Sequence, residues 1–217
     1  MSRMKALLRL AVAGAVSGAL AAGLAGCVSL LPKSKPAQLY RLTPTVATKG
    51  VPTPGSVGVF DGGGEFQPEA AGDRIVTVTN SHIAYIAQSR WAAPAQVMFE
   101  RAMDTAFEGS GGHVRLVPRG APAPTDYVLR VDVRNFEARY DAGEKAAPIV
   151  VVRVHAALAR DRNRSLVSET VFEARVTAAD NRVSAIVAAF SQATGQVLDQ
   201  LVGWTNEKAV PGTPAAA

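Results

Sequence analysis

Three consecutive runs of alternating apolar and polar residues, at positions 127–140, 150–158 and 166–176, most constrain what this chain can fold into. A period of two places one face of a strand in a core and the other face in solvent. The polar sequence ARDRNRS separates the second run from the third, as expected of a hairpin. The runs predict three long antiparallel strands in a meander with one wet face. Four charged residues are expected on that face: Arg153, Glu169, Glu173 and Arg175.

The first of these runs changes phase partway along. Up to Val133 the apolar residues stand at odd positions, whereas Phe136, Ala138 and Tyr140 continue the apolar set at even positions. One extra residue in a strand produces such a change, because it turns all later side chains to the other face. We therefore predict a β-bulge at residues 134–136.

Two segments repeat apolar residues at helical spacing. The first opens at Pro94, where a missing amide costs nothing, and ends in the sequence EGSGG at residues 108–112. The second follows Asp180, a good N-cap residue, and keeps one apolar face over about 26 residues, or about 39 Å. A helix of that length can lie across a whole sheet.

Shorter strands are predicted at residues 39–42, 56–60, 74–79 and 114–117. The sequence DGGGEFQPEAAGD interrupts them, and its three glycines invite comparison with a phosphate-binding loop. Neither a Lys-Ser or Lys-Thr pair nor a helix start follows, so a flexible loop is favoured. The elements together predict an α+β fold, a single domain over residues 39–206 with a mainly antiparallel sheet and two helices packed on one face.

The first 26 residues have the profile of an export signal. Arg3, Lys5 and Arg9 form a basic start, and no charge follows until Lys33. The uncharged stretch is also long enough for a membrane helix, which needs about 20 residues. Alanine and glycine dominate it, however, and such a helix gains little from hydrocarbon. A cleaved signal is therefore favoured over an uncleaved anchor.

The only cysteine of the chain, Cys27, ends this stretch within the sequence LAGC. Leu24–Cys27 matches the lipobox of bacterial lipoproteins, in which the thiol, a nucleophile, accepts a diacylglyceryl group and the signal is cut before it. The match implies a mature chain that starts at Cys27 and is held in a membrane by acyl chains such as palmitate, since two or more chains anchor firmly. The absence of acidic residues at Val28 and Ser29 favours the outer membrane, facing the periplasm, over inner-membrane retention.

Composition argues against a nucleic-acid partner and indicates a linker and a tail on either side of the domain. Removal of residues 1–26 takes away three basic residues and lowers the net charge from +5 to +2, which removes the main support for nucleic-acid binding. Residues 27–38, with two prolines, are predicted to be a lipidated linker, and residues 207–217 a disordered tail.

No pattern in the sequence indicates catalysis, a metal or a cofactor. His82, His113 and His155 lie on separate elements without metal-ligand spacing, and no nucleophile with a neighbouring base can be named. The chain is therefore expected not to be an enzyme. Trp91 and Trp204 are candidates for partner contacts, with core packing as the more ordinary interpretation.

The order of several short sequences resembles that of the ABC-type transport auxiliary lipoprotein family. They are the lipobox, LYRL (39–42), DRIV (73–76), SRWAAP (89–94), DYVLRVDVRNFEA (126–138) and AAFSQATGQVLDQLVGW (188–204). The resemblance implies helices on a mainly antiparallel sheet, and a role in moving lipids or other hydrophobic solutes between membranes. It also implies partners on separate chains: MCE-type subunits and an ABC permease and ATPase, with a homo-oligomer left open.

A second hypothesis stays open at this point. The domain could itself shield a lipid between its sheet and helices, or assist envelope assembly, because alanine-rich helix faces leave room for a ligand as well as for close packing.

Overall fold

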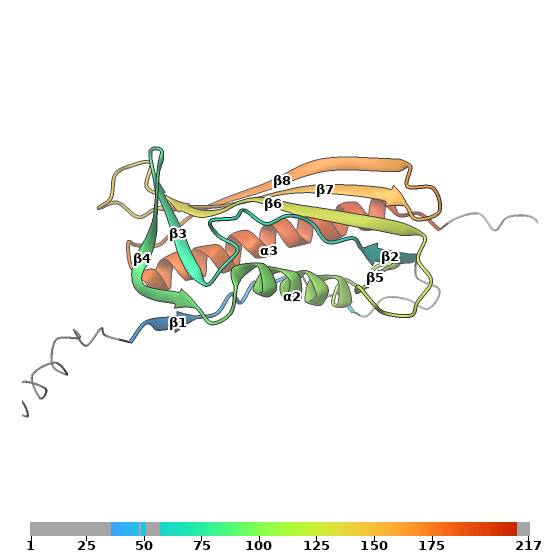
Figure 1. Ribbon diagram of the computed structural model, residues 1–217, viewed down its shortest axis with the longest axis horizontal. Coiled ribbons are helices and arrows are strands. Elements are labelled where there is room, and N and C mark those ends of the chain that lie inside the picture. The colour runs from blue at the N-terminus through green and yellow to red at the C-terminus, as the bar shows by residue number, and fades with distance from the viewer. Residues whose placement is uncertain (1–35, 48, 51–56, 212–217) are drawn as a thin grey trace, which may run out of the picture. The chain divides into compact units, whose positions relative to one another are not determined.

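The computed structural model describes residues 36–47, 49–50 and 57–211, and its compact domain begins at Ala37. The strands are β1 (Gln38–Tyr40), β2 (Val57–Asp61), β3 (Arg74–Thr79), β4 (His82–Trp91), β5 (Val114–Val117), β6 (Tyr127–Arg139), β7 (Ile149–Arg160) and β8 (Leu166–Thr177). The helices are α2 (Ala95–Glu108) and α3 (Val183–Lys208). Both helices lie on the same side of the long strands β6, β7 and β8 (Figure 1).

The three long strands form the predicted meander. β7 pairs antiparallel with β6 and with β8 along almost its whole length, from Ile149 to Ala159 and beyond. The pairing of β6 with β7 shifts between Val133 and Asn135, so the predicted bulge is confirmed at Arg134. The bulge explains why the buried set of β6 continues at Phe136 and Ala138 rather than at odd positions.

The sheet as a whole is mixed and mostly parallel, so the prediction of a mainly antiparallel sheet is wrong. Among the described residues, four of the seven strand pairings are parallel: β1 with β4, β2 with β5, β2 with β6, and β3 with β6. Each parallel pair joins strands that are not successive in the chain, because a parallel connection needs a crossover. Alternation within a strand reveals its buried face and not its neighbour, which is why the sequence pointed only to the antiparallel pairs.

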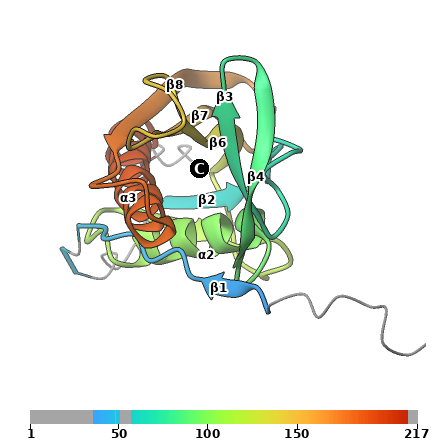
Figure 2. The same ribbon diagram turned by 90° about the vertical axis from the view of Figure 1, so that its left-hand side faces the viewer.

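The central strand β6 holds the two halves of the sheet together. One edge of β6 is covered by β7, while its other edge pairs with β2 at Tyr127–Leu129 and with β3 at Ala138 and Arg139. β3 continues into the antiparallel partner β4, and these two strands form a hairpin that stands on the right in Figure 2. β1 adds to the far side of β4 at Ser89–Trp91.

The core is mostly aliphatic and contains a cluster of aromatic rings that joins the sheet to α3. Phe136 of β6 contacts Phe190 of α3 and Trp91 of β4, with ring centroids 4.8 and 6.1 Å apart, and Phe66 stands 5.5 Å away. Trp91, Phe136 and Phe190 are each at most 2% exposed. Tilted and edge-on aromatic contacts of this kind add to the free energy of area burial.

The ends of α3 differ from the sequence prediction. The N-cap is Arg182 rather than Asp180, whose carboxylate instead accepts the Arg182 amide at 2.7 Å. At the other end, α3 continues to Lys208 and Ala209 is fully buried. The domain therefore includes residues 207–211, which the sequence assigned to the tail.

Candidate functional site

The predicted acylation site, Cys27, lies outside the described residues, as do the signal segment and all of the linker up to residue 35. Its modification stays a prediction. None of the helices that the structure describes combines the length and the hydropathy needed to cross a bilayer.

The glycine-rich segment after β2 lies extended along β6 and does not form a phosphate cradle. The Gly62 amide donates to the Leu129 carbonyl at 2.8 Å, and the Val131 amide donates to the Gly63 carbonyl at 3.0 Å. A Cβ atom at Gly64 would collide with the Val131 carbonyl, so the close approach requires glycine. The Gly63 amide is already bound to the Asp61 carboxylate at 2.8 Å. The segment predicted as a flexible loop is thus held by its backbone.

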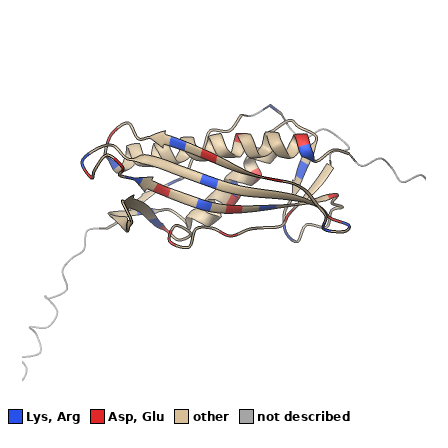
Figure 3. Ribbon diagram, turned by 90° about the horizontal axis from the view of Figure 1, so that it is seen from above, with Lys and Arg blue, Asp and Glu red and all other residues tan. Residues whose placement is uncertain are grey.

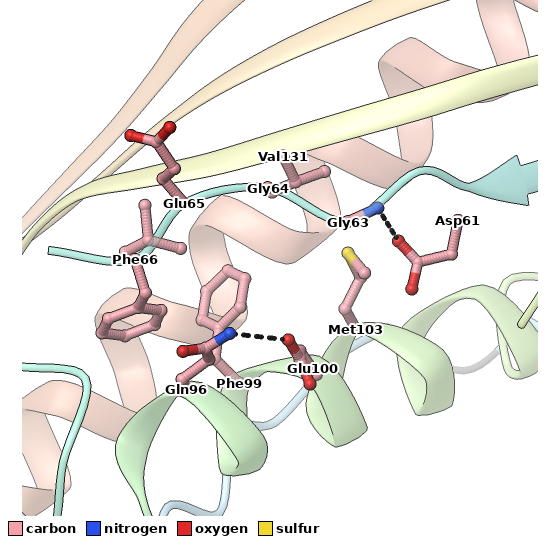
Figure 4. Close-up of a pocket in the computed structure, with 11 residues that line it drawn as sticks. Asp61, Gly63, Gly64, Glu65, Phe66, Gln96, Phe99, Glu100, Met103 and Val131 are labelled. Atoms are coloured by element: carbon pink, nitrogen blue, oxygen red, sulfur yellow. Dashed lines mark hydrogen bonds between the residues drawn. The ribbon is translucent and has the colours of Figure 1, made fainter. Parts of the chain in front are cut away.

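Beneath this segment, a cavity of about 20 Å³ separates it from α2 (Figure 4). Its walls include Phe66, Phe99 and Met103, with Asp61 and Glu100 on one side. A cavity of this size holds about one water molecule. This cavity between the glycine-rich segment and α2 is too small for a lipid, so it lends no support to the second hypothesis.

The carboxylates around this cavity form an ion cluster with one arginine. The Arg119 guanidinium lies 3.7 Å from Asp61 and 3.6 Å from Glu100. Burial raises the pKa of the neighbouring Asp104, and the charges of Asp61, Glu108 and Glu100 raise it further. Paired carboxylates can act as acid and base only where a substrate can enter between them. Here the cluster joins α2 to the loop after β5.

The three histidines belong to different parts of the described structure. His82 is exposed at the start of β4, and His113 has its Nε2 atom 2.9 Å from the Ala209 carbonyl oxygen. His155 stands between Asp132 and Glu169, with nitrogen to oxygen distances of 3.7 and 3.6 Å, and its Nδ1 atom is buried without a hydrogen-bond partner. Within the described ranges, no group of three His, Cys, Asp or Glu side chains could hold a metal ion.

The tryptophans occupy different environments. Trp91 is 2% exposed inside the aromatic core, so the expected partner contact at Trp91 is not available at the surface. Trp204 is half-buried near the end of α3, and its ring packs edge-on against Phe172 of β8 at 6.0 Å. A partner contact at Trp204 stays a prediction.

The outer face of the meander carries a network of charged residues (Figure 3). Arg153 lies 3.7 Å from Glu173, and Arg175 lies 3.6 Å from both Glu173 and Asp141. The four charged residues predicted for the wet face are thus present there, including Glu169 beside His155. Each exposed pair stabilises the fold little on its own. This face is accordingly a solvated surface with alternating charge, and no catalytic group stands out on it.

The sequence indicated only a loop between β1 and β2 and did not reveal that this link packs on α3. The Thr43 amide donates to Ser191 Oγ at 3.1 Å, and the Ala47 amide donates to Asp199 at 2.9 Å. Ser191, Gly195 and Asp199 are spaced by four along α3, and a Cβ atom at Gly195 would collide with the Thr45 carbonyl. Small and polar residues at this helical spacing were the signal that something lies on the back of α3.

Fold and topology together describe an α+β domain in which two helices lie on one side of a mixed sheet. A family model described as "ABC-type transport auxiliary lipoprotein component" matches residues 68–202. The chain belongs to this family. No curated protein matches the chain.

Solved structures share the fold. The crystal structure of protein XCC0632 from Xanthomonas campestris is similar with a TM-score of 0.67 and 27% identity, covering 79% of this chain and 96% of that one. The crystal structure of an uncharacterized protein is similar with a TM-score of 0.57 and 16% identity, covering 78% of this chain and 99% of that one. The second likeness supports the fold alone.

Proposed function

We propose that the chain is a non-enzymatic, lipid-anchored auxiliary subunit of an ABC transport system in the Gram-negative envelope. The observation that carries the proposal is the pairing of a lipobox at Leu24–Cys27 with a family match over residues 68–202. Acyl chains on Cys27 anchor the domain to the outer membrane on its periplasmic side. Two or more such chains give stable anchoring, whereas one gives marginal binding.

The partners in this proposal are MCE-type subunits together with an ABC permease and ATPase on separate chains, and the cargo is lipids or other hydrophobic solutes. A hydrophobic solute that crosses an aqueous gap needs a shielded path. A tethered domain can hold the far end of such a path at its target membrane. A homo-oligomer of the domain would suit a ring-shaped or tubular partner.

The packing beside Phe66 and Phe136 does not support a lipid held between the sheet and the helices. Phe136, Phe190 and Trp91 are buried there among many aliphatic side chains, and the cavity beside Phe66 holds about one water molecule. A protein that shields a lipid between sheet and helices would need several hundred Å³ there. The second hypothesis is accordingly the weaker of the two.

Anchoring is tested by the mass and location of the protein taken from its native envelope. We expect a chain that starts at Cys27 and carries acyl chains, found with outer-membrane fragments after density separation. Cys27→Ala removes the thiol that would carry the diacylglyceryl group, so we expect an unmodified chain with its signal uncut. An unmodified Met1 together with a free thiol in the native protein would count against the anchor.

Partnership is tested separately by crosslinking in intact cells followed by affinity purification. We expect MCE-type and permease subunits to copurify with the native protein. A matched preparation of Cys27→Ala should recover much less, because the domain is no longer held at the membrane. Consistent absence of these subunits, with the anchor intact, would overturn the transport role but not the lipidation.

A further inference from the structure

The link between β1 and β2 forms a strap over the helices, which we define as residues Arg41–Ala47. Two hydrogen bonds fix the strap to α3, from Thr43 to Ser191 and from Ala47 to Asp199. Gly195 lets the strap backbone approach between these two points. The strap is therefore attached to α3 at two points.

Between the strap and α2 lies a groove of about 550 Å³. That volume is within the range of about 300–1,000 Å³ found for small-molecule sites. Leu42 and Val46 line the groove from the strap, and Met98 and Ala102 line it from α2. All four side chains are half-buried, so the floor of the groove is apolar and accessible.

Two charged residues line the groove, and both are arginines. Arg41 enters from the strap and Arg101 from α2, and both are exposed. Neither forms a salt bridge with any residue that the structure describes. No acidic residue lines the groove. Guanidinium groups bind phosphate oxygens well, because their donors match the geometry of the anion.

We propose that this groove binds an anionic phospholipid. The phosphodiester lies at Arg41 and Arg101, and part of an acyl chain lies over Leu42, Val46, Met98 and Ala102. A net anionic lipid is preferred to a zwitterionic one, because the lining offers no carboxylate to a headgroup ammonium.

The position of the strap in the chain supports a lipid as the occupant. Arg41 follows Cys27 by 14 residues, which span at most about 50 Å when fully extended. An acylated Cys27 would therefore keep the groove within reach of a bilayer, and this step rests on the proposed anchor.

Two other cavities of the described domain fit a phospholipid less well. The interior cavity beside Phe66 has only about 20 Å³. A groove of about 420 Å³ near the end of α3 mixes Lys49 with Asp199, and its His113 already contacts the Ala209 carbonyl.

Native mass spectrometry of the full, membrane-extracted protein tests the proposal. The protein in detergent micelles is supplied with equal amounts of phosphatidylglycerol and phosphatidylcholine carrying the same acyl chains. We expect one bound phosphatidylglycerol, at least fivefold more abundant than bound phosphatidylcholine. Glycerol 3-phosphate, which lacks the chains, should not compete at the same concentration.

Variants assign the binding to the groove. Arg41→Gln and Arg101→Gln should each lower bound phosphatidylglycerol at least threefold, whereas Arg162→Gln should leave it unchanged. Arg162 is a matched control, since it is exposed in the turn after β7 and also forms no salt bridge with the described residues. Ala102→Trp, which fills the groove, should reduce binding of both lipids, and its unfolding temperature shows whether the fold is kept.

Any other outcome contradicts the proposal that the groove binds an anionic phospholipid. Equal binding of both lipids, or no effect of the two arginine variants, would overturn the proposed lipid site. Full competition by glycerol 3-phosphate would also overturn it, because it would indicate a simple anion site. A peptide or protein bound in place of lipid would identify a docking groove for a partner instead. The same spectra report acylation of Cys27, so a missing lipid adduct on an acylated chain overturns the groove alone, and an adduct on an unacylated chain overturns the anchor alone.

Discussion

At the scale of single residues, the contact between the strap and α3 depends on Gly195. A Cβ atom there would collide with the Thr45 carbonyl, which is a backbone group of the strap. We expect Gly195→Ala to lower the free energy of unfolding by about 1–2 kcal/mol, because overpacking outweighs the better helix propensity of alanine. Urea denaturation measures the change.

The matched control is Gly203 in the same helix. Nothing lies within 4 Å of a Cβ atom built at Gly203. Gly203→Ala should therefore stabilise the protein by about 0.5–1 kcal/mol through helix propensity alone. Equal effects of the two substitutions would show that the strap does not press on α3.

Another residue-scale prediction concerns Asp104. Burial and the charges of Asp61, Glu108 and Glu100 hold the pKa of Asp104 above its ordinary value. A carboxyl group with a raised pKa stabilises the fold while protonated, and this contribution is lost as the pH rises through the folded-state pKa. At pH 7 we expect Asp104→Asn to be more stable than the native protein by a few tenths of a kcal/mol, because solvent screens this half-buried group. Urea denaturation at pH 7 and at pH 3 should show the gain shrinking in acid.

For Asp132 we expect the opposite dependence of stability on pH. Partial burial raises its pKa, but the hydrogen bond from the Glu65 amide and the Arg130 guanidinium lower it more, so the pKa lies below its ordinary value. Its stabilising contribution is present above the unfolded-state pKa and is lost as the pH falls through the folded-state pKa. Asp132→Asn should lower the free energy of unfolding at pH 7 by about 1 kcal/mol and have little effect in strong acid. A loss of the same size at both pH values would contradict this assignment.

At the scale of elements, local patterns predicted the parts that have one buried face. The meander β6 to β8, the bulge at Arg134 and helix α3 were all predicted from alternation or helical spacing. β4 was not predicted, because Ile83, Ala84 and Ala87 are exposed and the strand shows no regular alternation of burial. Arg41 of the strap and Arg101 of α2 line one groove only in the folded chain, since the two elements are distant in sequence.

Also at the scale of elements, Phe136 is the residue at which a helix and the sheet meet. Its ring contacts Phe190 of α3, Trp91 of β4 and Phe66 beside β6, so one side chain joins helix and sheet. We expect Phe136→Ala to lower the free energy of unfolding by about 3–5 kcal/mol. Leu166→Ala, at a side chain that is 59% exposed, should change it by less than about 0.5 kcal/mol. Near-equal losses measured by denaturation would mean that Phe136 is not the centre of the core.

At the scale of the whole molecule, the end of the described chain fastens α3 to the opposite layer. The Tyr127 hydroxyl donates to the Val210 carbonyl at 2.8 Å, and His113 Nε2 lies 2.9 Å from the Ala209 carbonyl oxygen. Tyr127 begins β6, and His113 directly precedes β5. Residues 209 and 210 thus connect the end of the long helix to the starts of β6 and β5, the strands on either side of β2.

Truncation separates this fastening from the residues beyond it. A chain that ends at Lys208 loses the buried Ala209 and both carbonyl contacts, and it should be about 2 kcal/mol less stable, since each hydrogen bond contributes about 1 kcal/mol. A chain that ends at Pro211 keeps all of them and should match the full chain in urea denaturation. If the chain ending at Pro211 were as weakened as the shorter one, residues 212–217 would contribute to the fold, and the predicted disordered tail would have to be abandoned. If neither were weakened, the contacts of residues 209 and 210 would contribute little, and α3 would be held by its packing against β7, β8 and α2 and by the strap.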